Sequence, residues 1–133
     1  MDTRYINDIY AEIGQGLIDA EDELRYIKES QATIIYLSSE HEKKADGKLV
    51  LGQCEKVPDR YKWGIPCDFT ITIFEPNVLG FTTEQMAALV FHELLHVGIR
   101  EDNGKERYFI RPHDLEDFKI IIDRFGTDWS AKA

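Results

Sequence analysis

The amino-acid sequence predicts an α+β fold in which a small, mostly antiparallel sheet packs on a buried helix. Three runs rich in β-branched and aromatic residues, at 32–37, 48–57 and 68–74, have the composition of strands. The stretch TTEQMAALVFHELLHVGI at 82–99 carries apolar residues at helical spacing instead. Further helices are predicted near both ends of the chain.

Length and composition indicate a single globular domain. With 133 residues, of which 43% are apolar and 31% charged, the chain can bury its own hydrophobic core. We expect one domain over 1–133, with an N-terminal helical segment at about 1–30 and a core at about 31–126. No apolar run approaches the roughly 20 residues of a membrane span, and the N-terminus lacks a signal-peptide pattern. A cytoplasmic protein without a membrane segment is therefore expected.

Charge and cysteine content argue against two classes of protein. The net charge of −9 disfavours binding to the phosphates of nucleic acids. Cys54 and Cys67 are too few for a secreted disulfide framework and are expected to be reduced core residues. Acidic residues at 19–23 are expected to form a solvated face. No pattern indicates the oligomeric state.

The first 29 residues are predicted to be helical with an interruption. Apolar residues between positions 5 and 13 recur at helical spacing, and a helix-prone stretch resumes at 17–29. Gly14 and Gly16 separate the two, which predicts two short helices or one helix with a break.

Strands and turns follow. Asp46-Gly47 predicts a hairpin turn before the strand at 48–57, in which Gly52 is a candidate bulge. The clearest strand is DFTITIF at 68–74, because apolar and polar residues alternate along it.

After the central helix, Asn103-Gly104 predicts a second hairpin turn. A short strand or extended segment is expected at 107–110. Beyond Pro112, apolar residues from Leu115 to Phe125 recur at helical spacing and predict a final amphipathic helix that ends at Gly126.

The stretch at 82–99 is predicted to be a buried helix. Thr82 and Gln85 have the spacing of a capping box, and Phe81 and Met86 have that of a hydrophobic staple. Gly98 marks the region where the helix is expected to end.

His92, Glu93 and His96 form the pattern H-E-x-x-H within this helix. Residues four apart lie on one face of a helix, so the two imidazoles can reach the same ion. Imidazole suits Zn²⁺, and a catalytic zinc keeps three protein ligands and one position for water. Glu93 is then placed to accept a proton from that water. Burying histidine and glutamate side chains is costly unless they are paired or bound to a metal. The interpretation with two core histidines that bond only to carbonyls is therefore less favoured than a zinc site.

A third protein ligand is expected downstream of His96. The metzincin pattern requires a histidine at position 102, where this chain has Asp102, so that class is rejected. His113 precedes the last predicted helix, and Glu116 lies one turn beyond it, where both can face one site. Glu116 is also a candidate ligand, because thermolysin-like enzymes carry a glutamate ligand at such a spacing. We prefer His113 as the ligand, with Asp114 or Glu116 orienting a ligand imidazole. A surface role for His113 and a capping role for Asp114 remain alternatives.

The motifs DFTITI, HELLH and RPHDLEDF together resemble the putative phage metallopeptidase family, from about residue 34 to about residue 125. This family comprises small zincin-like proteins of phages and prophages, distantly similar to SprT-like and ImmA-like metallopeptidases. The resemblance implies a single-domain zincin-like α+β fold, zinc ligands at His92, His96 and His113, and Glu93 as general base.

We expect a zinc-dependent metallopeptidase that hydrolyses peptide bonds in a protein or peptide. Zincin-like enzymes commonly hold the substrate along a sheet edge, and the strands at 68–74 and 32–37 are candidate edges. The alternative is a zinc-containing module that binds a host or phage protein without catalysis, which a fourth protein ligand such as Glu116 would favour. Three further residues have the chemistry to stabilise a transition state, although no pattern places them at the metal: His41, Tyr108 and Arg111.

Overall fold

The computed structural model describes residues 3–112. The helices and strands occur in this order: β1 Arg4–Ile6, α1 Asp8–Ala20, α2 Arg25–Lys28, β2 Ile34–Ser39, β3 Lys44–Ala45, β4 Lys48–Leu49, β5 Gly52–Lys56, β6 Phe69–Phe74, α3 Thr83–Leu94, β7 Val97–Asp102 and β8 Lys105–Ile110. Short 3₁₀ helices are found at Asp22–Leu24, Asp59–Tyr61 and Glu75–Val78.

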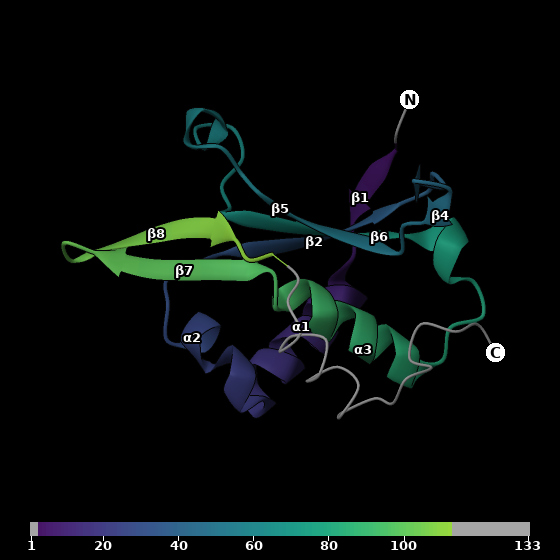
Figure 1. The fold of residues 1–133 in the computed structure, drawn as a ribbon, viewed down its shortest axis with the longest axis horizontal. Helices are drawn as coiled ribbons and strands as arrows, with labels where there is room; N and C mark the ends of the chain where they lie inside the picture. The colour runs from purple at the N-terminus through teal and green to yellow at the C-terminus, as the bar shows by residue number, and fades with distance from the viewer. Residues whose placement is uncertain (1–2, 113–133) are drawn as a thin grey trace.

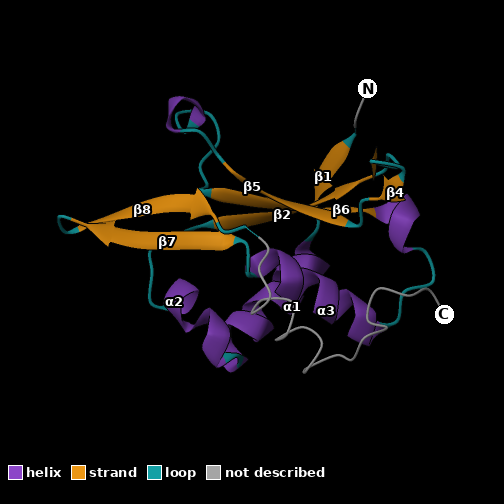
Figure 2. Cartoon of the chain, in the orientation of Figure 1, coloured by secondary structure: helices purple, strands orange, loops and turns teal. Residues whose placement is uncertain are grey.

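A four-stranded sheet with helices on one face forms the body of the molecule (Figures 1 and 2). The strand order is β1-β2-β6-β5, in which β2 and β6 are parallel and the other pairs are antiparallel. Two antiparallel pairs, β3–β4 and β7–β8, are separate from this sheet. The predicted α+β class with mostly antiparallel strands is therefore confirmed.

The core lies between the sheet and α3. Phe69, Ile71 and Ile73 on one face of β6 are fully buried, as the alternation of the sequence predicts. They belong to one cluster with Leu89 and Leu94 of α3. Each large apolar side chain buried in this way contributes about 1.5–3 kcal/mol relative to exposure. Apolar packing between β6 and α3 therefore holds the helix against the sheet.

The predicted capping box starts α3. Thr82 Oγ1 accepts a hydrogen bond from Gln85 N at 3.1 Å, and Gln85 Oε1 accepts one from Thr82 N at 2.8 Å. Because each side chain satisfies an otherwise unpaired N–H of the first turn, such a cap stabilises a helix by about 1 kcal/mol.

The end of α3 differs from the prediction. The helix ends at Leu94 rather than near Gly98, and β7 begins at Val97. Gly98 pairs with Phe109 across the β7–β8 hairpin, and a Cβ at position 98 would collide with the Phe109 ring. Val97 and the two residues after it, which the sequence pattern assigned to the helix, thus belong to a strand that pairs with β8.

The N-terminal prediction was partly wrong. Residues 4–6 form β1, which pairs with β2, rather than the start of a helix. α1 continues through Gly14 and Gly16, and the helical path changes only at Glu21. Gly14 is buried because the Tyr36 hydroxyl occupies the position where a Cβ would project. The glycine serves close packing of α1 on β2 and does not break the helix.

Both predicted hairpin turns are present. Asp46 and Gly47, and likewise Asn103 and Gly104, have positive φ angles between 53° and 79°, as a two-residue type I′ turn requires. The strand predicted at 48–57 is divided into β4 and β5. The predicted strand at 107–110 begins earlier, because β8 starts at Lys105.

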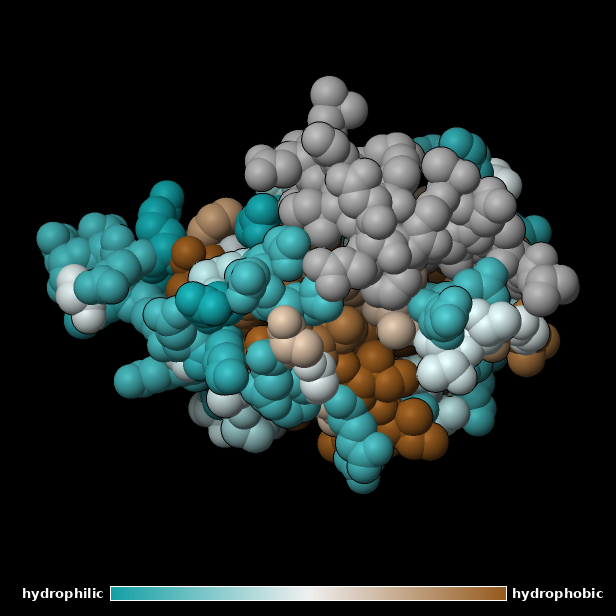
Figure 3. Space-filling view, turned by 90° about the horizontal axis from the view of Figure 1, so that it is seen from below, coloured by the Kyte–Doolittle hydropathy of each residue, from teal (hydrophilic) through white to brown (hydrophobic). Residues whose placement is uncertain are grey.

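Figure 3 shows the helical face of the molecule, where hydrophilic side chains cover the outer end of the β7–β8 hairpin and apolar side chains gather near the centre. Among the described helices, no segment is long and apolar enough to cross a membrane. The predicted C-terminal helix lies outside the described residues.

Candidate metal centre

A cavity of about 330 Å³ lies between β5 and α3. Residues 51–54 form one wall, Leu89, His92, Glu93 and His96 form the opposite wall, and Ile110 lies at one end. The cavity therefore contains all three polar residues of the H-E-x-x-H pattern.

His92 and His96 lie close together, although only His92 is within the helix. Leu95 keeps helical backbone angles after α3 ends, and His96 N donates to Glu93 O at 3.1 Å, so the turn of the chain continues as far as His96. The two imidazole rings are 5.1 Å apart between centroids and stand nearly perpendicular, at 82°. The predicted approach of the two rings is present even though the helix is shorter than expected.

The ring of His96 is oriented by the backbone of Arg111. His96 Nδ1 lies 2.6 Å from the carbonyl oxygen of Arg111, and Arg111 N donates to His96 O at 2.7 Å. Because a carbonyl oxygen only accepts, Nδ1 carries the proton, and the lone pair of a neutral ring is then on Nε2. This is the tautomer that binds a metal through Nε2.

Glu93 is the buried acidic residue of the site. Its residue surface is 5% exposed, and within residues 3–112 no hydrogen bond or ion pair to its carboxylate is found. Burial alone raises the pKa of Glu93 to about 8, because removal from water disfavours the charged form. A carboxyl group that is buried at a cavity and has no partner among the described residues is costly for stability, and such groups are typical of functional sites.

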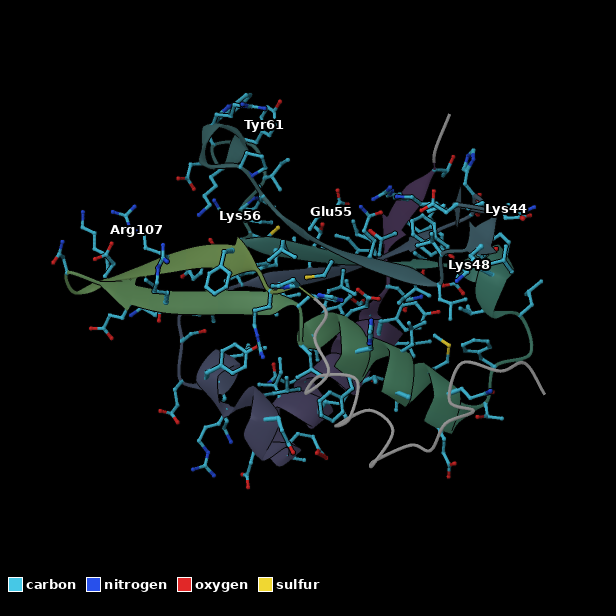
Figure 4. The ribbon with its side chains drawn as sticks, in the orientation of Figure 1. Lys44, Lys48, Glu55, Lys56, Tyr61 and Arg107 are labelled. Carbon is cyan, nitrogen blue, oxygen red and sulfur yellow. The ribbon has the colours of Figure 1, made fainter. Side chains whose placement is uncertain are left out.

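Gly52 and Cys54 form the wall that faces Glu93. A Cβ at Gly52 would lie 3.1 Å from Glu93 Oε2, so the absent side chain leaves room for the carboxylate. Cys54 is half-buried at the cavity, whereas Cys67 is buried as expected, and both are free thiols. Burial, then the nearby Glu93 and Glu55 carboxylates, raise the pKa of the Cys54 thiol. Glu55 projects from the other side of β5, away from α3 (Figure 4).

The other predicted site residues are not gathered at this cavity. Tyr108 packs edge-on against Phe69 and borders a different cavity, and His41 is exposed. The predictions for His113, Asp114 and Glu116 lie outside the described residues. Within the described part of the chain, no group of three or more His, Cys, Asp or Glu side chains is arranged to hold a metal.

The predicted substrate edges were wrong. The strands at 32–37 and 68–74 correspond to β2 and β6, which are both internal to the sheet. The strand beside the cavity is β5, which is an edge of the four-stranded sheet. β6 is buried along nearly its whole length, on both faces. The sequence signal of such a central strand is that FTITIF contains no charged residue.

Comparison with known proteins adds a family assignment. A family model described as "Putative phage metallopeptidase" matches residues 3–133. Neither a curated protein nor a solved structure matches the chain.

Proposed function

The chain belongs to this putative phage metallopeptidase family, and from that premise we propose that it is a zinc-dependent peptidase with Glu93 as general base. The family assignment supports metal-dependent hydrolysis of a protein or peptide. The positions of His92, Glu93 and His96 at one cavity support the proposed residue roles.

The observation that carries the proposal is the position of Glu93 beside the two imidazoles. The carboxyl group is buried in the cavity wall that also contains His92 and His96. As a base, Glu93 accepts a proton from a water molecule in the cavity and later delivers it to the leaving amine. A positive charge held nearby would favour the ionised form of Glu93, which this role requires.

The donor set fits zinc. His92 and His96 offer two neighbouring imidazoles, and the hydrogen bond to Arg111 O prepares His96 to bind through Nε2. We assign His113 as third ligand, because Arg111 contacts the His96 ring and His113 is only two residues later in the sequence. When bound, zinc supplies Lewis acidity that lowers the pKa of water and polarises the scissile carbonyl.

An extended peptide is the substrate form that the cavity favours. One edge of β5 is hydrogen-bonded to β6. Residues 51–54, which include the start of β5, line the cavity wall that faces Glu93. A peptide that adds to this edge would be held by backbone hydrogen bonds and would pass the carboxylate. The proposed substrate edge is therefore β5, and not β2 or β6.

Glu93→Gln tests the general-base role. The amide has nearly the same shape but cannot accept the proton, so peptide hydrolysis should fall by at least about 100-fold. Zinc content should stay unchanged, because the proposed ligands are intact. The measurement is cleavage of a peptide library by the two zinc-loaded proteins, beside zinc content by plasma mass spectrometry. Full hydrolysis by the variant would refute the assignment of Glu93.

A further inference from the structure

We propose that Tyr26 and Arg111 form a positioning pair that fixes the orientation and tautomer of His96. The inference deepens the proposed function and depends on His96 being a metal ligand. Tyr26 is on α2, far from His96 in the sequence, and no catalytic motif includes it.

The first step is the contact between Arg111 and His96. Both backbone groups of Arg111 bind His96, one at its ring Nδ1 and the other at its carbonyl oxygen. The orientation of the imidazole therefore depends on where the Arg111 peptide groups lie. Arg111 follows the last residue of β8, and its bond to His96 O continues the pairing of that strand by one residue.

The second step is the anchor of the Arg111 side chain. Arg111 Nη1 donates to the Tyr26 hydroxyl at 3.1 Å, and the guanidinium carbon lies 5.6 Å from the centre of the Tyr26 ring. A guanidinium that donates a hydrogen bond to an aromatic residue and also makes a cation–π contact with its ring is held in a narrow range of positions.

The third step is the contact between the Tyr26 hydroxyl and the residue that follows His96. The Tyr26 hydroxyl donates to Val97 O at 2.5 Å, and Val97 is bonded covalently to His96. A phenol has one proton to donate and can accept at its oxygen, so both contacts of Tyr26 are chemically compatible. The chain of contacts runs from the His96 ring through Arg111 and Tyr26 back to the residue after His96. Movement of any member would therefore move the imidazole.

The consequence for the metal concerns affinity. Partners that fix a ligand histidine through its second nitrogen typically change metal affinity or activity by about 10- to 100-fold when they are removed. Tyr26 acts on the ring through Arg111, so Tyr26→Phe should lower zinc affinity by about tenfold, at the lower end of that range. The benzene ring of Phe preserves the packing and removes only the hydroxyl contacts.

The test is zinc affinity by chelator competition on the full chain, with the absorption spectrum of bound Co²⁺ as a second readout. Tyr108→Phe is the matched control, because its hydroxyl bonds Glu106 at 2.7 Å and it borders a different cavity. We expect weaker zinc binding and an altered Co²⁺ spectrum for Tyr26→Phe, and wild-type values for the control. Thermal unfolding of the metal-free proteins checks that all variants fold.

A double variant separates positioning from general loosening of the structure. Tyr26→Phe and Arg111→Met break the same contact from opposite sides, so together they should cost little more affinity than the larger single change. Wild-type zinc affinity in Tyr26→Phe, or fully additive losses in the double variant, would overturn the inference. Absence of zinc binding by the wild-type chain would instead overturn the proposed function on which it rests.

Discussion

Gly52 illustrates how a single residue shapes the environment of Glu93. Its φ is not in the left-handed region, so the backbone accepts alanine there. A Cβ would, however, lie 3.1 Å from Glu93 Oε2 and 3.2 Å from Ile73 Cδ1, closer than ordinary van der Waals contact. Since the carboxylate is the more movable of the two neighbours, it is expected to shift away from its present position.

Gly52→Ala should therefore reduce peptide hydrolysis by roughly tenfold, because displacement of a catalytic group by a fraction of an ångström lowers the rate steeply. The free energy of unfolding should fall by no more than about 1 kcal/mol, at the low end of the range for overpacking, since the Glu93 carboxylate borders a cavity into which it can move. Steady-state kinetics on a cleaved peptide and thermal unfolding measure the two effects. Unchanged kinetics would show that Gly52 does not determine the position of Glu93.

At the scale of elements, the two glycines of α1 have different roles. A Cβ at Gly14 would collide with the Tyr36 hydroxyl of β2, whereas nothing lies within 4 Å of a Cβ at Gly16. Gly14 thus sets the distance between helix and sheet. Gly16 only lowers the helix propensity of an exposed position.

Opposite effects on stability are predicted for the two alanine variants. Gly16→Ala should raise the free energy of unfolding by about 0.5–1 kcal/mol through helix propensity. Gly14→Ala gains the same propensity but forces Tyr36 to move, and overpacking of about 1–3 kcal/mol should leave it less stable than wild type. Denaturant unfolding of the pair measures this difference. Equal stabilisation by both changes would contradict the close packing of α1 on β2.

Local sequence signals predicted some elements well. The capping box of α3, the alternation of β6 and the two positive-φ turns are set by neighbouring residues, and all are present. The end of α3 was wrong because pairing of β7 with β8 outweighs helix propensity. β1 was missed because a strand of three residues has too few positions to show a period.

At the scale of the whole molecule, the order of strands decides what surrounds the site. Spacing in the sequence predicted that His92, Glu93 and His96 lie together, and they line one cavity. The wall at residues 51–54 and the Arg111 carbonyl at His96 were not predicted from the sequence. These contacts join distant parts of the chain, so no local pattern encodes them.

The metal content of the purified chain, measured by plasma mass spectrometry, tests most directly whether this cavity holds a catalytic zinc. We predict about one zinc per chain for wild type, and loss of zinc in His92→Ala and His113→Ala. Full zinc in His113→Ala would contradict the third ligand. No metal in the wild-type protein, and no uptake from added zinc, would contradict the account of the site.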